Sequence, residues 1–396
     1  MMDLLILSSM ALELLLLLGL FLSGRGYVRQ SFPGRVPEAP QGGDPAEPCP
    51  RTAIIVPLTG SSPEMRGSLQ SLLNQNYPDF EMVLVTRDQE DPATLLVREV
   101  LTANPKGRHV ISGPATSCSQ KNHNLLAGLA AVGDSVKILV FCDSTHQAPP
   151  QFLRDLIGPL VDGKAVLTSG FHRIIPGDFR LATLGRLQTV LALQLLHGIP
   201  RISQPWGGAT AIVRSVFEDR GVARLWSQNV VDDVSMAAHL RRSGIRARPM
   251  ATACLTTDLA GQTVEVWEAW LTRQLLYLKY CLPGTWLGGA LAVYLLVVPP
   301  LVAVLACLGG IVGLVPGKEA LVGAGFLALL TGVAAWYRTL VPQRIPLGPW
   351  LAAFYGALGL TCWSYLKTWR TDTISWRGIS YRVTWGGKVR EIILRR

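Results

Sequence analysis

Several acidic side chains stand where a predicted strand ends or a predicted helix begins. Asp143 directly follows the predicted strand Lys137–Cys142, which is apolar enough to lie in the centre of a sheet. The other acids in such positions are Asp88, Asp91, Asp232 and Asp233. In an open α/β sheet, ligands bind beside the carboxyl ends of the strands. These acids are therefore the first candidates for chemistry.

The order of the acids suits the transfer of a sugar from a nucleotide-sugar with inversion. An early acid, Asp88 or Asp91, can hydrogen-bond a base or a ribose. Asp143 can hold Mg²⁺ or Mn²⁺, which prefer oxygen ligands and offset the charge that builds on a departing diphosphate. A third acid must act as general base on the acceptor hydroxyl, and Asp233 is the candidate.

A structural role competes with the chemical one for each acid. Asp91-Pro92 is a good helix N-cap followed by proline at the first helical position. Asp232 and Asp233 also suit the start of a helix, where the dipole favours negative charge. Each signal is weak alone, and the joint order of the acids along one sheet favours chemistry.

From Arg51 onward, short β-branched runs alternate with helical patterns, which predicts an α/β sheet with parallel strands. The candidate strands are Ala53–Leu58, Glu81–Thr86, His109–Ser112, Lys137–Cys142, Ala165–Gly170 and Ala251–Thr256. The candidate helices are residues 63–75, 91–103, 119–132, 149–162, 178–196, 232–243 and 262–279.

Apolar residues are concentrated in blocks, and only 16% of the chain is charged, against about 25% in a usual soluble domain. Residues 3–22 are long enough to span a bilayer, which takes about 20 residues. A cleaved signal peptide is the alternative, but no basic segment precedes the run. The basic residues follow it instead, which predicts that the next segment faces the cytoplasm; they are Arg25, Arg29 and Arg35.

A second apolar block comprises residues 285–316, 319–337 and 347–366. Three crossings there would leave the basic tail outside, against the positive-inside rule. Either residues 285–316 cross twice around Pro299-Pro300, or one apolar segment is re-entrant.

The net charge of +10 comes from 37 basic and 27 acidic residues, and much of the excess lies in residues 367–396. Beside membrane spans, a basic tail is predicted to contact anionic headgroups. No motif supports a nucleic-acid partner. The seven cysteines contain no C-x-x-C pair, so neither a zinc site nor a disulfide framework is indicated. His109, His123, His146 and His239 lack metal-ligand spacing and are interpreted as structural.

Several segments together carry a resemblance to a known family. They are Ser71–Glu81, Asp88–Ala93, Lys121–Leu125 (with Gln120 in place of a proline), Cys142–Ser144, His197–Arg201, Asp232-Asp233 and, most specifically, Thr373–Gly378 with Tyr381-Arg382 and Gly386-Gly387. In these segments the chain resembles ceramide glucosyltransferases and their bacterial relatives, including hopanoid-linked glycosyltransferases. These are family-2-type enzymes with the GT-A fold, and the resemblance runs from the first apolar segment to the tail.

The resemblance implies a GT-A domain held between membrane segments. The expected parts are a transmembrane anchor at 1–24, a linker at 25–50, the GT-A domain at 51–261, an interfacial helix at 262–283, transmembrane helices at 284–366 and a basic tail at 367–396. The implied reaction moves a hexose, glucose or N-acetylglucosamine, from a UDP-sugar to a lipid hydroxyl. The acceptor would be ceramide-like, a hopanoid or a glycerolipid.

The resemblance also implies roles for single residues. Asp91 would contact the nucleotide, Asp143 the metal and diphosphate, and Asp233 would be the base. Lys121 and His197 would lie near the donor or acceptor. Further expected pocket residues are Asp88, Trp206, Asp232, Arg273 and Gln274, although the turn at Trp206-Gly207-Gly208 is equally consistent with a plain loop.

One motif departs from the family. A Gln/Arg-x-x-Arg-Trp motif is expected, and residues 270–274 keep Arg273 but have Gln274 in place of the tryptophan. That tryptophan usually lines the acceptor or sugar pocket, so the acceptor class is open. The helix at 262–279 carries aromatic residues that suit either headgroup depth or a buried core: Trp267, Trp270, Tyr277 and Tyr280. The alternative functions are a processive polysaccharide synthase and an inactive membrane scaffold.

Overall fold

The computed structural model describes residues 4–32, 49–102, 104 and 106–394, so most of the predicted linker lies outside the described residues. A seven-stranded sheet has the order β3-β2-β1-β4-β6-β5-β7. Its strands are β1 Thr52–Pro57, β2 Phe80–Thr86, β3 Gly107–Ile111, β4 Ile138–Cys142, β5 Leu167–Pro176, β6 Ala209–Val213 and β7 Arg248–Leu259. Neighbours are parallel except for β6, which is antiparallel to both β4 and β5. The predicted α/β fold with a mostly parallel sheet is confirmed.

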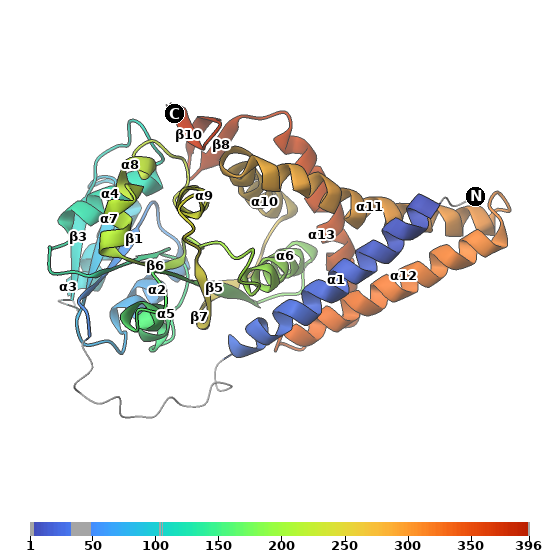
Figure 1. Cartoon of the computed structure of the whole chain (residues 1–396), viewed down its shortest axis with the longest axis horizontal. Helices are drawn as coiled ribbons and strands as arrows, with labels where there is room; N and C mark the ends of the chain where they lie inside the picture. Colours follow the sequence, from blue (N-terminus) through green and yellow to red (C-terminus); the bar gives the residue numbers. More distant parts are fainter. Residues whose placement is uncertain (1–3, 33–48, 103, 105, 395–396) are drawn as a thin grey trace.

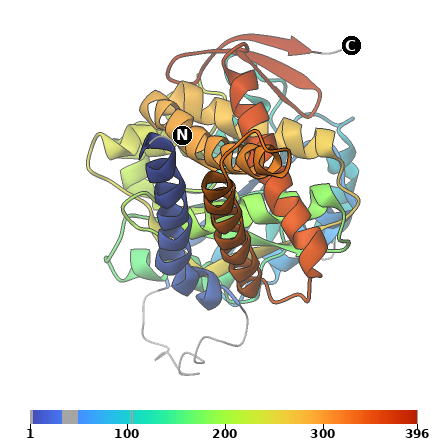
Figure 2. The same cartoon turned by 90° about the vertical axis from the view of Figure 1, so that its right-hand side faces the viewer.

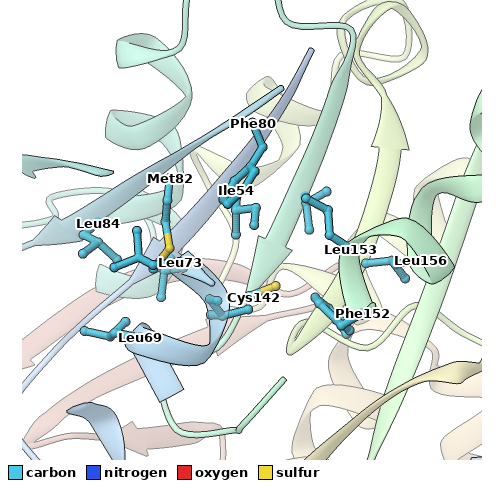
Figure 3. Packing of buried hydrophobic residues seen from close by; sticks show 14 of the residues in the cluster. Ile54, Leu69, Leu73, Phe80, Met82, Leu84, Cys142, Phe152, Leu153 and Leu156 are labelled. Carbon is cyan, nitrogen blue, oxygen red and sulfur yellow. The ribbon is translucent and has the colours of Figure 1, made fainter. Parts of the chain in front are cut away.

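Helices cover both faces of this sheet (Figure 1). They are α2 Pro63–Leu73, α3 Pro92–Thr102, α4 Gln120–Ala131, α5 Phe152–Val161, α6 Leu181–His197, α7 Arg214–Asp219, α8 Val222–Trp226 and α9 Asp233–Arg241. Alternate residues of β1 enter separate cores: Ile54 packs with α2 and α5, as Figure 3 shows, and Ile55 packs on the α4 side. Burial on both faces explains why these strands are continuously apolar.

Among the described residues, three helical stretches are long and apolar enough to cross a membrane: α1 Leu4–Gln30, α11 Pro283–Ile311 and Gly317–Leu340. The last comprises α12 Gly317–Tyr337 and the short helix η1 Arg338–Leu340. Helix α1 continues to Gln30, past the residue at which the anchor is predicted to end and into the predicted linker. Pro299 and Pro300 lie buried inside one continuous α11, which contradicts the alternative in which residues 285–316 cross twice. Neighbouring helices let a membrane helix tolerate proline.

The third C-terminal apolar run forms α13 Leu347–Thr368, which is not one of these stretches. It lies between the sheet domain and the group of α1, α11 and α12 (Figure 1). Gln188 of α6 donates to the carbonyl of Trp350 at 2.7 Å, and Trp286 of α11 donates to the Thr368 hydroxyl at 3.0 Å. Helix α13 is therefore fastened to the sheet domain at one end and to the base of α11 at the other.

Helix α10 Val264–Cys281 connects the sheet domain to α11. The tail forms a three-stranded antiparallel sheet of β8 Thr373–Trp376, β9 Ile379–Thr384 and β10 Lys388–Leu394. Ile374 and Tyr381 of this sheet pack with Val231 and with Leu276 of α10. The tail is thus folded against the sheet domain and α10, which the sequence interpretation as a headgroup-binding segment did not include.

The end of α1 packs against α6, and Figure 2 shows α1, in blue, from the side of the apolar helices. A Cβ at Gly24 would lie 2.7 Å from the carbonyl oxygen of Leu195, and one at Gly198 would lie 2.6 Å from the Cβ of Tyr27. Arg173 of β5 donates to the carbonyl of Ser31 at 2.7 Å. Close backbone approach therefore joins the apolar helix directly to the sheet domain.

Candidate active site

A cavity of about 1100 Å³ lies at the carboxyl ends of β1 and β4, enclosed by the starts of α4 and α9, by α6 and α10, and by the β8–β9 turn. Eight predicted site residues line it: Lys121, Asp143, His197, Trp206, Asp232, Asp233, Arg273 and Gln274. Asp88 and Asp91 are not in its lining. The fold thus brings these eight residues to one cavity, although the first and last of them, Lys121 and Gln274, are 153 positions apart in the sequence.

Lys121 joins two of the predicted acids. Ser119 caps α4 by accepting a hydrogen bond from Asn122 N, which fixes the helix start and places Lys121 in its first turn. The Lys121 Nζ lies 2.9 Å from Asp143 Oδ1 and 3.1 Å from Asp232 Oδ1. Burial tends to raise the pKa of Asp143, but its neighbours, Lys121 first among them, together outweigh burial, so the net pKa lies below the usual value. Burial opposes the charge of Lys121, yet the neighbouring acids raise its pKa overall, so the ammonium is retained.

Asp233 has a different environment from its neighbours. Its Oδ2 accepts from Gly207 N at 2.8 Å and its Oδ1 from Val234 N at 2.6 Å. Burial, and then repulsion from Asp232, raises the pKa of Asp233 to about 7. A carboxylate with a near-neutral pKa is suited to general-base work.

A side chain at Gly207 would displace the Lys121–Asp232 ion pair. A Cβ there would lie 2.5 Å from Asp232 Oδ2 and 2.9 Å from Lys121 Nζ. The Trp206-Gly207-Gly208 turn is therefore part of the site and not a remote loop, because its backbone both holds Asp233 and leaves room for the Lys121–Asp232 ion pair.

Sequence reasoning missed a histidine pair beside Asp143. His146 Nε2 lies 3.9 Å from Asp143 Oδ2, and both His146 and His172 line the cavity. Trp206 stacks on His172 with ring centroids 4.6 Å apart and an angle of 9°. Burial lowers the pKa of His146 to about 4 and that of His172 well below its usual value, so both rings are neutral. The position of His146 three residues after the strand-end acid was the available signal.

The tail also contributes to the cavity, through Trp376, Arg377 and Tyr381. Arg377 has a φ of 49° and Gly378 a φ of 80°, which is the backbone of a tight hairpin turn. Asparagine, aspartate or glycine usually occupies the first of these positions. The Tyr381 hydroxyl accepts from Gln120 N at 3.0 Å and so binds the start of α4, next to Lys121.

The two early acids take structural positions. Asp91 is buried, and its Oδ1 accepts from Gly60 N at 2.8 Å and from Ala93 N at 2.9 Å, as expected of an N-cap. Asp88 pairs with Arg87 at 2.5 Å and lines a second cavity of about 390 Å³ between the sheet domain and the tail. Contact of either acid with a nucleotide stays a prediction.

His197 lies in the wall of the large cavity but is 5% exposed. It stacks on Phe171, and its Nε2 lies 3.3 Å from the Ser169 carbonyl oxygen. Tyr27 of α1 packs edge-on against it, with ring centroids 5.6 Å apart. These contacts join α1 to β5 through His197. A role of His197 in contact with the donor or the acceptor stays a prediction.

Helix α10 presents one face to the core and another to the cavity. Trp267 is 1% exposed and packs against Gly185, which favours the buried-core interpretation for this ring. Trp270, Arg273, Gln274 and Tyr277 line the cavity. The Arg186 guanidinium lies 4.8 Å from the Trp270 ring centroid. Residues 270–274, where Gln274 replaces the tryptophan of the family motif, therefore lie in the cavity wall.

The residues around Asp143 suit a hard divalent cation. Among the described residues, no group of three or more His, Cys, Asp or Glu is arranged to hold a metal. Mg²⁺ and Mn²⁺ at phosphate sites are usually held by one or two carboxylates, with phosphates and water supplying the rest. Asp143 fits this pattern, because its side chain is 32% exposed and Lys121 occupies only Oδ1.

Comparison with known proteins gives one family match and several similar structures. The model of glycosyl transferase family 21 matches residues 18–389. A mannosyltransferase from Pyrobaculum calidifontis, solved with GDP-mannose and Mn²⁺, is 18% identical, with a TM-score of 0.52 over 90% of this chain and 99% of that one. Glucosyl-3-phosphoglycerate synthase from Mycobacterium tuberculosis, solved with Mn²⁺ and UDP-glucose, is 17% identical, with a TM-score of 0.35 over 58% of this chain and 78% of that one.

Proposed function

The chain belongs to glycosyl transferase family 21 and is a glycosyltransferase, and from this premise we propose that it transfers a hexose from a UDP-sugar to a lipid hydroxyl, with inversion. The observation that carries the proposal is the separation of roles among three neighbouring acids. Asp143 and Asp232 share the Lys121 ammonium, whereas Asp233 is held by backbone amides with its pKa raised to about 7. Asp233 is therefore separate from the Lys121 ion pairs, and its carboxylate is left to accept a proton.

In the proposed mechanism, Asp233 accepts the proton of the acceptor hydroxyl as that oxygen attacks the anomeric carbon. Attack from the side opposite the diphosphate inverts the configuration in one displacement. Lys121 keeps Asp143 anionic and stands ready to meet phosphate oxygens. The alternative of an inactive scaffold does not explain Asp233. A buried carboxylate without a cationic partner costs stability, and a protein without catalysis would gain nothing from it.

A divalent cation, Mg²⁺ or Mn²⁺, is proposed to bind through Asp143 and the donor diphosphate. When bound, it would neutralise charge on the departing diphosphate. We expect chelation with EDTA to stop sugar transfer, and Mn²⁺ or Mg²⁺ added in excess to restore it. The measurement is transfer rate before and after chelation in the same membranes. Full activity in EDTA would remove the metal from the mechanism.

The pH dependence follows from Asp233. Its raised pKa means that the carboxyl is protonated, and inactive as a base, below about pH 7. We expect kcat/KM to rise with pH and level off once the pH exceeds about 7, and to fall about tenfold per pH unit well below it, as expected for one essential base. A profile flat from pH 5.5 to 8.5 would contradict this assignment.

The acceptor side of the cavity is proposed to be its apolar end. Leu193, Leu196 and Ile202 line it near α6, and Trp270 and Leu278 line it on α10. This lining lies between the acids and the apolar helices, which supports a lipid acceptor. Gln274 in the same wall offers a polar amide where the family has an indole, and so favours an acceptor with an additional hydrogen-bonding group.

The direct test is incubation of membranes containing the protein with labelled UDP-glucose and UDP-N-acetylglucosamine, followed by lipid mass spectrometry. A new hexosyl lipid that requires Asp233 supports the proposal. GDP-mannose is the informative alternative donor, because the Pyrobaculum mannosyltransferase was solved with it. Transfer from GDP-mannose alone would contradict the UDP-sugar donor, and a lengthening polysaccharide would favour the processive alternative.

We propose that the sheet domain and the tail both face the cytoplasm. They pack on each other, so the crossings between them must be even in number, and α11 with α12 supplies two.

We expect Leu314→Cys, in the exposed α11–α12 turn, to react with an impermeant thiol reagent on intact cells. Arg390→Cys, in the exposed part of the tail, should react only after lysis. The reverse pattern, in chains stripped of native cysteines, would overturn this topology.

A further inference from the structure

Two cavity histidines share one hydroxyl group. The Nδ1 atoms of His146 and His172 each lie 2.7 Å from Thr257 Oγ1. A threonine hydroxyl has a single proton, so it donates to at most one of the two rings. At least one ring must therefore carry its own proton on Nδ1 and present an unprotonated Nε2. An unprotonated imidazole nitrogen is a metal ligand.

His146 is the ring whose Nε2 faces an acid. The distance of 3.9 Å to Asp143 Oδ2 is too long for a direct hydrogen bond. Two ligands of one ion, each about 2.1 Å from it, are about 3.0 Å apart when adjacent and about 4.2 Å apart when opposite. The observed distance lies within that range. Asp143 Oδ1 is already engaged by Lys121, which leaves Oδ2 for this position.

His146 is also held in place from both ends. Ser68 Oγ donates to its carbonyl oxygen at 2.7 Å. The next residue, Gln147, exchanges two backbone hydrogen bonds of 2.9 Å with Thr256. Thr257 holds the ring itself. A metal-binding histidine usually has its other nitrogen fixed by such a partner, which sets the tautomer and the ring orientation.

We propose that His146 Nε2 and Asp143 Oδ2 together ligate the divalent cation of this site, with diphosphate and water completing its shell. The proposal rests on the proposed function, since the diphosphate belongs to the donor. His172 is not a ligand in this assignment. Its ring is stacked on Trp206, and it completes the hydrogen bond at Thr257. Mg²⁺ is a hard cation that takes oxygen ligands, so a nitrogen ligand is expected to make this site bind Mn²⁺ more tightly than Mg²⁺.

The test is electron spin-echo spectroscopy of Mn²⁺ bound to the purified full chain in the presence of UDP. The wild type should show the ¹⁴N modulation of a directly bound imidazole. His146→Gln should abolish it, and the matched variant His172→Gln should retain it. The dissociation constant for Mn²⁺ should rise by at least about tenfold in His146→Gln, with a smaller rise for Mg²⁺. Thr257→Val should keep the signal but weaken Mn²⁺ binding.

The outcomes separate this inference from the proposed function. The spectrum needs only Mn²⁺ and UDP, so the nitrogen signal is measured whether or not sugar reaches a lipid. Modulation that persists in His146→Gln, or that disappears only in His172→Gln, overturns the assignment. Absence of any nitrogen signal in the wild type also overturns it, and leaves Asp143 as the ligand. Sugar transfer that depends on Asp233 would then stand on its own.

Discussion

The Asp233→Asn variant is expected to lose sugar transfer almost completely while still binding UDP-sugar. Asparagine keeps an oxygen that can accept from Gly207 N but cannot take a proton from a hydroxyl. Positioned general bases contribute about 10²- to 10⁴-fold, so kcat should fall by about 10³-fold. The dissociation constant for the donor should change little, because the lost group acts on the acceptor.

The stability of the variant provides a second, independent measurement. Removing a negative charge beside Asp232 relieves repulsion, whereas asparagine can keep only one of the two backbone hydrogen bonds, so the thermal midpoint should change little. Asp258→Asn is the matched control, since Asp258 lines the same cavity from β7 and is assigned no chemical step. Near-wild-type transfer by Asp233→Asn, or equal losses in both variants, would show that Asp233 is not the base.

The Lys121→Met variant is expected to lose both activity and stability. Methionine keeps much of the side-chain length but leaves Asp143 and Asp232 without their shared cation. Removing one partner of a buried ion pair costs about 3–5 kcal/mol. We expect a drop of that size in the free energy of unfolding. We also expect kcat/KM to fall by more than about 100-fold, which corresponds to a loss of about 2.7 kcal/mol in transition-state stabilisation.

The sign of the pH effect distinguishes this cause from a general packing defect. Without the ammonium, burial should leave the folded-state pKa of Asp143 above its unfolded value. The ionised carboxyl then costs stability at neutral pH, and that cost disappears as the pH falls below about 4 and the carboxyl is protonated. The deficit of Lys121→Met should therefore shrink in acid. Lys164→Met, which breaks the exposed pair with Asp162, is the control and should cost less than about 1 kcal/mol. A deficit independent of pH would contradict the ion-pair account.

The central part of the fold could be predicted because burial leaves a direct trace in sequence. β1, β2 and β4 are covered on both faces, so they are unbroken apolar runs. β6 was missed because Ala209–Val213 is short and begins with small residues after a glycine turn. The tail strand β9 was missed although Ile379, Tyr381 and Val383 alternate with polar residues, because the surrounding positive charge favoured a headgroup-binding segment.

The site was predictable where its residues follow strand ends, and not where tertiary contacts decide. Asp143 and Asp233 could be placed from local pattern, and both line the cavity. His146 was interpreted as structural because ligand spacing was sought within a short stretch, whereas its orienting partner Thr257 is 111 residues away. The different environments of Asp232 and Asp233 also depend on Lys121. The family resemblance placed Lys121 near the substrates, but its ion pairs with Asp143 and Asp232 are tertiary contacts that no local pattern reveals.

The docking of α1 on α6 has a mechanical consequence. Tyr27 and Gly24 are locked into the sheet domain without an intervening flexible hinge, since α1 is a single helix from Leu4 to Gln30. With α1 held in a bilayer, the height of the Asp233 carboxylate above the lipid surface is set by a stiff rod and not by a tether. Under the proposed function, a lipid acceptor would have to bring its hydroxyl to the depth at which this rod holds the Asp233 carboxylate, so the length of the acceptor headgroup would decide which lipids react.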